Sequence, residues 1–292
     1  MAFCRQTVRL FLPGNRYTCI KRYISNQSKY LTVKKDEEFD DVVILKMVKE
    51  PDNSICTNLL EVLSETLQQL EDSKSYRAIV LTSGVTGIFS SGLDMLSLRQ
   101  KPSNEIYKFW SLYQETWVRL YASSLITVAA INGSATASGC ALATACDSRV
   151  MAEGDHVIGH DETRTGWLVP NWVKFGMVNL IGFKETERSF QKGTIFSPED
   201  AQKIGLVDMV VPKDDLMTSV RIRLKESASL EDDLRISTKN MMRRETTENL
   251  NHRQQEDVTN MTIYSLLEHV QESIVDTNAQ YLGWKPVPWP SG

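Results

Sequence analysis

Two segments rich in small residues and one glutamate are the parts of this sequence best suited to chemistry. The small-residue segments are residues 88–95 and 131–140, and each follows an apolar run. Small side chains let a ligand approach the backbone, and a helix that begins in such a segment offers free N–H groups. Two N–H groups converging on one carbonyl oxygen would form an oxyanion hole. The pattern alone leaves open whether the segments bind substrate or are tight turns for close packing.

The glutamate is Glu162, within Gly159-His160-Asp161-Glu162-Thr163. It follows a short apolar run and precedes the apolar residues 167–169. A carboxylate among apolar groups can act as a base near neutral pH. Taken alone, however, the segment fits a solvated glutamate in a turn better than a catalytic one.

Motifs for several other chemistries are absent from the sequence. It has no Walker loop, no G-x-G-x-x-G, no G-x-S-x-G, no H-E-x-x-H and no paired CxxC. Its four histidines lack metal-ligand spacing: His156, His160, His252 and His269. We therefore expect no metal site, and nucleotide hydrolysis and serine hydrolysis have little support.

Charge divides the chain into a basic head and an acidic body. Residues 1–35 hold eight Lys or Arg and no acid, and the remainder holds 25 basic and 37 acidic residues. The composition of the head predicts a mitochondrial transit peptide in residues 1–25 and a location in the matrix; a disordered basic tail is the alternative. An acidic body is not expected to bind nucleic acid. No apolar run is long enough to predict a membrane span.

Strands and helices alternate in the first two-thirds of the chain. Apolar runs at residues 77–82 and 125–131 predict buried strands, and helical spacing predicts helices at 54–70 and 106–121. The alternation indicates an α/β fold with a largely parallel sheet, whose strand ends would carry the small-residue segments. The aromatic side chains of residues 106–121 fit core packing, or in part an acyl pocket. The tail from residue 216 is predicted to be helical and to pack on the core or on a neighbouring subunit.

Several segments, in this order, resemble the crotonase (enoyl-CoA hydratase/isomerase) superfamily from about residue 30 to about residue 215. They are Phe89-Ser90-Ser91-Gly92-Leu93-Asp94, Asn132-Gly133 with Ser138-Gly139-Cys140, and Ser197-Pro198-Glu199 with Gly205-Leu206-Val207. The resemblance implies a crotonase-like α/β fold, a spiral of parallel-sheet ββα units, in residues 30–215. A C-terminal helical region would follow in residues 216–292. Crotonase-like proteins also lead us to expect a homotrimer.

The resemblance also bears on the reaction. Hydratases of the superfamily place two glutamates at the site, and their counterparts here are Ala141 and Glu162. A single base suits the movement of a double bond, so the resemblance implies conversion of 3-cis- or 3-trans-enoyl-CoA to 2-trans-enoyl-CoA in β-oxidation of unsaturated fatty acids. No cofactor is implied, because coenzyme A is part of the substrate. Thioester hydrolysis, weak hydration and a non-catalytic acyl-CoA-binding role are the alternatives.

By the same resemblance, Glu162 is the expected base, and the backbone N–H groups of Ser91 and Ser138 form the expected oxyanion hole. The expected substrate contacts are Ser91, Gly92, Leu93, Asp94, Met95, Ser138 and Asp161. Ser138 stands where the superfamily usually has glycine, so its N–H can serve only if its φ is negative. Asp161 replaces a neutral amide. If Asp161 lies close to Glu162, the two carboxylates should titrate together; otherwise Asp161 points to solvent or caps an N–H group.

Overall fold

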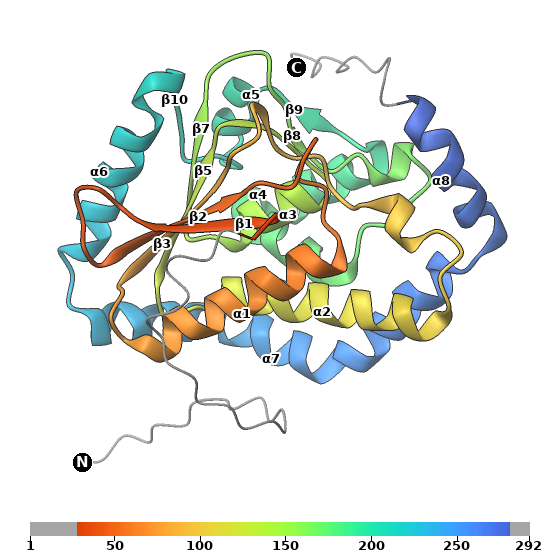
Figure 1. Ribbon diagram of the computed structural model, residues 1–292, viewed down its shortest axis with the longest axis horizontal. Helices are drawn as coiled ribbons and strands as arrows, with labels where there is room; N and C mark the ends of the chain where they lie inside the picture. Colours follow the sequence, from red (N-terminus) through yellow and green to blue (C-terminus); the bar gives the residue numbers. More distant parts are fainter. Residues whose placement is uncertain (1–27, 281–292) are drawn as a thin grey trace.

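The computed structural model describes residues 28–280 (Figure 1). The predicted transit peptide, residues 1–25, lies outside the described residues. Within them, no helix is long and apolar enough to cross a membrane.

A six-stranded sheet forms one side of the core, in the order β1-β2-β3-β5-β7-β10. Its strands are β1 (Leu31–Lys35), β2 (Val42–Met47), β3 (Ala78–Ser83), β5 (Ile126–Ile131), β7 (Ser148–Ala152) and β10 (Met209–Val211). β1 is antiparallel to β2, and the other neighbours are parallel. β3 and β5 are buried along their whole length, which is why their sequences read as continuous apolar runs.

A second, four-stranded sheet has the order β4-β6-β8-β9. It consists of β4 (Gly87–Ser90), β6 (Gly133–Thr136), β8 (Ile158–Gly159) and β9 (Ile195–Phe196). Neither β4 nor β6 was predicted as a strand from the sequence. Their Gly, Ser, Ala and Thr residues have little β-forming pattern, but they let the strands approach closely. A Cβ on Gly133 would lie only 2.1 Å from the carbonyl carbon of Gly87.

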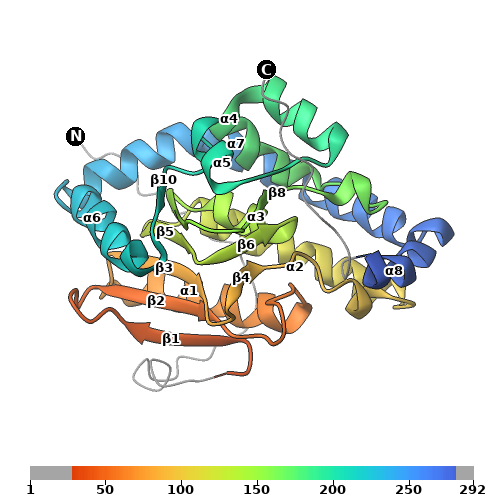
Figure 2. The same ribbon diagram turned by 90° about the horizontal axis from the view of Figure 1, so that it is seen from above.

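The two sheets are built from successive turns of one spiral (Figure 2). Each turn gives one strand to the large sheet and one to the small sheet, followed by a helix. The helices of the three turns are α2 (Ser103–Tyr121), α3 (Ser138–Ala145) and α4 (Asn171–Lys192). α1 (Thr57–Ser73) follows the β1–β2 hairpin. This arrangement confirms the crotonase-like spiral of ββα units.

The helix α4 consists of two helical segments. Gly182, with φ 76° and ψ 165°, makes a kink between them. The short helix α5 (Pro198–Lys203) follows, capped by the Ser197 hydroxyl, which accepts from the Asp200 N–H.

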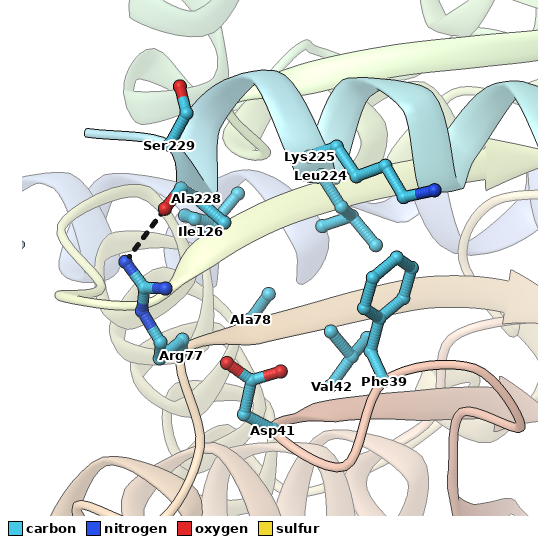
Figure 3. A pocket seen from close by; sticks show the side chains of 10 residues that line it. All are labelled: Phe39, Asp41, Val42, Arg77, Ala78, Ile126, Leu224, Lys225, Ala228 and Ser229. Atoms are coloured by element: carbon cyan, nitrogen blue, oxygen red, sulfur yellow. Dashed lines mark hydrogen bonds between the residues drawn. The ribbon is translucent and has the colours of Figure 1, made fainter.

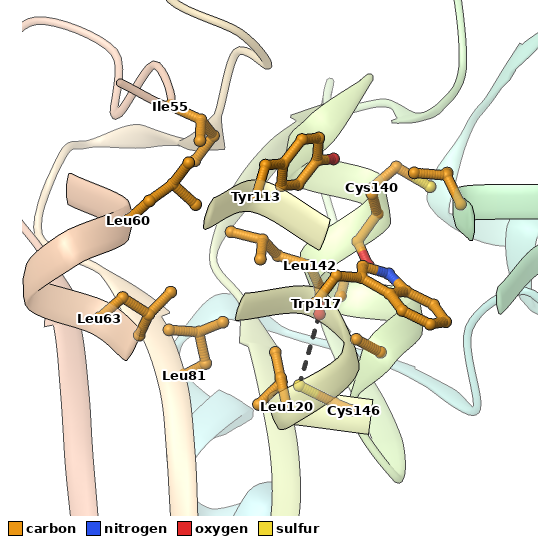
Figure 4. Close-up of a cluster of buried hydrophobic side chains, with 14 of the residues drawn as sticks. Ile55, Leu60, Leu63, Leu81, Tyr113, Trp117, Leu120, Cys140, Leu142 and Cys146 are labelled. Atoms are coloured by element: carbon orange, nitrogen blue, oxygen red, sulfur yellow. Dashed lines mark hydrogen bonds between the residues drawn. The ribbon is translucent and has the colours of Figure 1, made fainter. Parts of the chain in front are cut away.

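A buried apolar cluster fills the space between the large sheet and the helices α1, α2 and α3 (Figure 4). Leu81 of β3, Leu63 of α1 and Trp117 of α2 are each at most 1 % exposed. The other aromatic residues of α2 extend the same core, with Trp110 packed edge-on against Trp172 at 6.0 Å between ring centroids. The aromatic helix therefore serves mainly as core.

The C-terminal region is helical, with α6 (Leu216–Ala228), α7 (Asp232–Ser265) and α8 (Glu268–Gln280). α7 lies along α2, where the Trp110 Nε1–H donates to the Ser265 hydroxyl at 2.9 Å (Figure 1). Lys239 of α7 reaches the Asp147 carboxylate at 2.7 Å. The tail thus packs on the core, which is one of the two arrangements predicted for it.

Candidate active site

The small sheet brings together the three segments predicted to carry chemistry. β4 and β8 both pair in parallel with β6, so the carboxyl ends of all three strands lie at one edge. The segments that leave this edge contain Leu93, Ser138 and Glu162. Open α/β folds bind ligands beyond the carboxyl ends of their strands, which makes this edge the candidate site.

The loop after β4 touches the start of α3 at Gly92. This residue has φ +103°, and a Cβ there would lie 2.9 Å from the Ala137 Cβ and 3.6 Å from the Ser138 nitrogen. A side chain would therefore push the two segments apart. Thr136 also links them, because its hydroxyl donates to the Ser91 carbonyl at 3.1 Å.

The backbone N–H group that this loop leaves without an acceptor is not the one that was expected. The Ser91 N–H, expected to face the substrate, donates to the Asp52 carbonyl at 3.1 Å, because residues 52–55 run alongside the loop. The Asp94 N–H is engaged in the same way, with the Ile55 carbonyl at 2.9 Å. Within the described chain, the Leu93 N–H has no acceptor, so it replaces Ser91 as the candidate oxyanion donor.

Ser138 has the backbone that its expected role requires. It is the first residue of α3, and the positive φ falls on the preceding residue, Ala137, at 49°. Ala137 is held there because its N–H donates to the Gly159 carbonyl at 2.8 Å. No acceptor among the described residues takes the Ser138 N–H, which as part of the first turn has no partner within the helix.

The polar side chains of the first loop are engaged within the protein. The Ser91 hydroxyl donates to the Asp52 carboxylate at 2.8 Å. Asp94 pairs with Lys49 at 3.1 Å and accepts from the Ser97 N–H, so it caps the short 3-10 helix η2 (Met95–Leu98). These contacts hold the shape of the loop. The predicted roles of Ser91, Asp94 and Met95 as substrate contacts stay predictions.

Glu162 begins a second short 3-10 helix, η3 (Glu162–Arg164), which is tied to the end of α4. The Thr163 hydroxyl donates to the Phe190 carbonyl at 2.6 Å, and Arg164 Nε–H donates to the Lys192 carbonyl at 2.8 Å. The Trp167 N–H donates to the Glu162 carbonyl at 2.8 Å. Glu162 itself is only 7 % exposed, so it is not a solvated turn residue.

The two oxygens of the Glu162 carboxylate have different surroundings. Oε1 lies 3.1 Å from His160 Nδ1, in a pair whose side chains are 0 % and 9 % exposed. Oε2 is buried and has no hydrogen-bond partner among the described residues. A buried acceptor without a partner is costly unless a ligand supplies a donor. Oε2 is therefore the atom suited to receive a proton from a bound molecule.

Asp161 is also buried, at 4 % exposure, and its Oδ1 has no partner in the described chain. Burial, and then the charge of Glu162, raise the pKa of Asp161 to about 6. Its side chain caps no N–H of η3. The alternative in which Asp161 points to solvent is therefore wrong, and the joint titration of the two carboxylates stays a prediction.

Three further side chains belong to this neighbourhood and had no assigned role from the sequence. Tyr113 of α2 lies near Ser138 and Glu162, and burial raises its pKa so that it stays a neutral phenol. His160 pairs with Glu162, and Cys140 of α3 lies near the His160 ring. Tyr113 stood out only as one ring in an aromatic helix. No spacing in the sequence identified His160 or Cys140.

Ala141, the counterpart of the first hydratase glutamate, is fully buried in α3. Its carbonyl accepts from Trp117 Nε1–H at 3.0 Å. α3 thus contributes backbone donors and no carboxylate to the site. Among the described residues, no group of three His, Cys, Asp or Glu could hold a metal ion.

A hollow of about 220 Å³ lies elsewhere, between the large sheet and α6 (Figure 3). Val42, Ala78 and Ile126 line it, and each stands at the amino end of its strand. The Arg77 guanidinium at its rim is engaged by Asp232 at 2.9 Å. Its place at the amino ends of the strands, opposite the small-residue segments, argues against it as the catalytic site.

Known proteins are similar to this chain in both sequence and architecture. The family model for enoyl-CoA hydratase/isomerase matches residues 37–283. The chain is 40 % identical to mitochondrial enoyl-CoA delta isomerase 1 of Mus musculus over 234 residues, covering 80 % of this chain and 81 % of the relative. The crystal structure of human mitochondrial delta3-delta2-enoyl-CoA isomerase superposes with a TM-score of 0.82 at 33 % identity, covering 85 % of this chain and 96 % of that one.

An enoyl-CoA hydratase from Bacillus halodurans shares the fold, with a TM-score of 0.77 at 19 % identity over 85 % of this chain and 99 % of that one. The family model and the mouse relative each cover most of the chain, and both agree with the spiral of ββα units and the segments at its small sheet. This chain belongs to the enoyl-CoA hydratase/isomerase family.

Proposed function

We propose that this protein is a Δ3,Δ2-enoyl-CoA isomerase that converts 3-cis- or 3-trans-enoyl-CoA to 2-trans-enoyl-CoA in β-oxidation of unsaturated fatty acids. One observation carries the proposal: the site has a single buried glutamate with an unpartnered oxygen, together with two unpartnered backbone N–H groups. Ala141 stands where the hydratases have their other glutamate. The names of the mouse and human relatives support the same reaction.

In the proposed reaction, the N–H groups of Leu93 and Ser138 hold the thioester oxygen. Glu162 Oε2 takes a proton from the α carbon, and the electrons of that C–H bond enter the dienolate. The two donors stabilise the negative charge on the oxygen, each by about 3–4 kcal/mol if they resemble measured oxyanion-hole donors. Protonated Glu162 then delivers the proton to the γ carbon, which leaves the double bond between the α and β carbons.

No cofactor or metal enters this scheme, because the thioester itself makes the α proton acidic and one base suffices for both transfers. Coenzyme A acts only as part of the substrate. Asp161 and Tyr113 lie beside the base and would bound the space in which the acyl chain reacts.

We extend the proposal to the location and assembly of the protein. The basic, acid-free residues 1–35 support import into the mitochondrial matrix, and the relatives are named as mitochondrial. Exposed apolar side chains on α7, Met241 and Met242 among them, support a homotrimer in which this helix contacts another subunit. A reporter fused to residues 1–35 should reach the matrix, and sedimentation should give three times the chain mass.

The direct test offers the purified protein 3-cis- and 3-trans-enoyl-CoA and follows the 2-trans product. The same preparation is assayed for hydration of 2-enoyl-CoA and for release of free coenzyme A. Isomerisation should exceed both by at least about 10²-fold, as expected for a site that has alanine in place of the first hydratase glutamate. Hydration or hydrolysis as fast as isomerisation would replace the proposal with one of the alternatives, and acyl-CoA binding without turnover would indicate the non-catalytic one.

A further inference from the structure

His160 is a buried titratable group that the reaction above does not use. Its side chain is 0 % exposed, and its Nδ1 lies 3.1 Å from Glu162 Oε1. Its other ring nitrogen, Nε2, is buried and has no hydrogen-bond partner among the described residues. The contact therefore couples the state of His160 to that of the proposed base.

The ring of His160 is held on more than one side. The Phe190 ring of α4 packs edge-on against it, with 5.1 Å between centroids and 69° between planes. Cys140 of α3 lies near it as well. His160 follows Gly159, the last residue of β8, whose carbonyl accepts from Ala137. These contacts give the ring little freedom, so the direction of its Nδ1 is fixed by the fold.

The contact with His160 leaves the two Glu162 oxygens unequal. The contact at Oε1 restrains the rotation of the carboxylate, and the oxygen left without a partner among the described residues is Oε2. A base must sit within a fraction of an ångström of the proton that it removes, and a misplacement of about 1 Å can lower a rate about 10²-fold. Restraint of this carboxylate therefore bears directly on turnover.

We propose that His160 is a positioning residue that donates its Nδ1–H to Glu162 Oε1, orients the carboxylate and leaves Oε2 for the proton of the substrate. The proposal rests on the proposed isomerase function, which it deepens. His160 does not touch the reacting atoms. It acts through Glu162, and it also favours the ionised carboxylate, because a hydrogen bond to a charged form stabilises that form.

The electrostatics of the pocket agree with such a pair. Burial lowers the pKa of His160, but the interactions with Glu162 and Cys140 together outweigh burial and hold this pKa well above its ordinary value. The other titratable or charged groups around the pair are Asp161 and Arg164 on the same segment, Tyr113 from α2 and Cys140 from α3. α4 contributes the apolar Phe190 to the ring.

Two variants test the proposal, and both carry a side-chain amide, but on side chains of different length. In His160→Asn the amide N–H can occupy the place of Nδ1–H, whereas in His160→Gln it reaches toward the place of Nε2. We expect His160→Asn to keep kcat within about 5-fold of the wild type, and His160→Gln to lower kcat about 10- to 100-fold, the range of a misplaced base. KM should change less than about 3-fold in both, because no substrate contact is removed.

The pH profile separates positioning from a merely structural role. In His160→Gln the acid limb of kcat/KM should move up by about one pH unit, since the donor that favours the ionised carboxylate is gone. In His160→Asn it should stay near the wild-type position. Equal kcat values for the two variants, whether both high or both low, overturn the proposal. So does an acid limb that moves in neither variant.

A readout independent of turnover distinguishes failure of this proposal from failure of the proposed function. The pKa of His160, followed by NMR of the ring in otherwise wild-type protein, should fall when Glu162→Gln removes the partner charge. If the wild-type protein has no isomerase activity but the pKa of His160 still falls on the Glu162→Gln substitution, the proposed function is rejected and the His160–Glu162 pair stands. An unchanged His160 pKa in Glu162→Gln would reject the pair itself.

Discussion

The two sheets of this protein are specified in opposite ways. The large sheet is built from side chains that must leave water: β3 reads Ala-Ile-Val-Leu-Thr-Ser and is buried throughout. The small sheet is built from residues with little side chain, and β6 reads Gly-Ser-Ala-Thr. The large sheet supplies stability, whereas the small sheet supplies a backbone surface at which unpaired N–H groups and a buried carboxylate can meet. Stability and chemistry are thus assigned to different strands of the same spiral turns.

The difference predicts that the small sheet tolerates added volume least. In Gly133→Ala the new Cβ would meet the backbone of Gly87 and Ile88 at 2.1 to 2.4 Å, and backbone cannot move aside as a side chain can. We expect a loss of about 4 kcal/mol or more in the free energy of unfolding, together with loss of turnover. Chemical denaturation and the isomerase assay measure both.

Gly84→Ala is the matched control for this substitution. Its Cβ would meet only the side chains of Val48 and Lys46, at 2.8 Å and 3.2 Å, which can shift. It should cost clearly less stability than Gly133→Ala. Equal losses would show that the close approach of β4 and β6 is not the feature that matters.

In the large sheet, removal of a side chain should affect stability and spare the chemistry. Leu81 of β3 is 1 % exposed within the main apolar cluster. Leu81→Ala should lower the free energy of unfolding by about 2–5 kcal/mol through the lost burial and the cavity left behind. At a temperature where the variant stays folded, its kcat should remain within about 2-fold of the wild type. A kcat loss as large as that of a site variant would contradict the division between the sheets.

Asp161→Asn tests the comparison at the active site. The pKa of Asp161 is raised from 3.8 to about 6, so the folded state disfavours the ionised form. The wild type therefore loses stability as pH rises from about 4 to about 6, and the loss is complete above that range, with an upper bound of about 3 kcal/mol. Asp161→Asn should be stabilised relative to the wild type at pH 7.5 and much less so at pH 4.

The same substitution should move the acid limb of kcat/KM to lower pH, because a negative neighbour no longer opposes ionisation of the base. Denaturation at the two pH values and a pH–rate profile check the two effects. A stability difference that does not depend on pH, with an unmoved acid limb, would mean that Asp161 does not sense Glu162.

The large sheet and its helices could be predicted from the sequence because their signal is hydrophobic periodicity. The run at 77–82 and the aromatic helix at 106–121 match β3 and α2 within a few residues. β4 and β6 could not be predicted, since Gly and Ser carry no such signal and the strands form only against each other.

At the site, the family resemblance identified the segments that meet at the small sheet, but one of the two backbone donors that it named is engaged within the protein. Ser91 was the expected donor, yet its N–H is taken by Asp52, a contact set by a segment about forty residues earlier in the chain. The pairing of His160 with Glu162 depends on how β8 ends and η3 begins, which no spacing rule describes. The first contact follows from the packing of segments that are distant in sequence, and the second from the local path of the backbone between β8 and η3.

Substitution of Glu162 by glutamine tests most directly the central claim that one glutamate carries out both proton transfers. Glutamine keeps the shape and removes the basic oxygen, so folding and acyl-CoA binding should persist. Turnover of 3-enoyl-CoA to 2-enoyl-CoA should fall by about 10²- to 10⁴-fold, the range of general acid–base catalysis. A Glu162→Gln protein that keeps a tenth or more of the wild-type kcat would contradict the claim and place the base elsewhere.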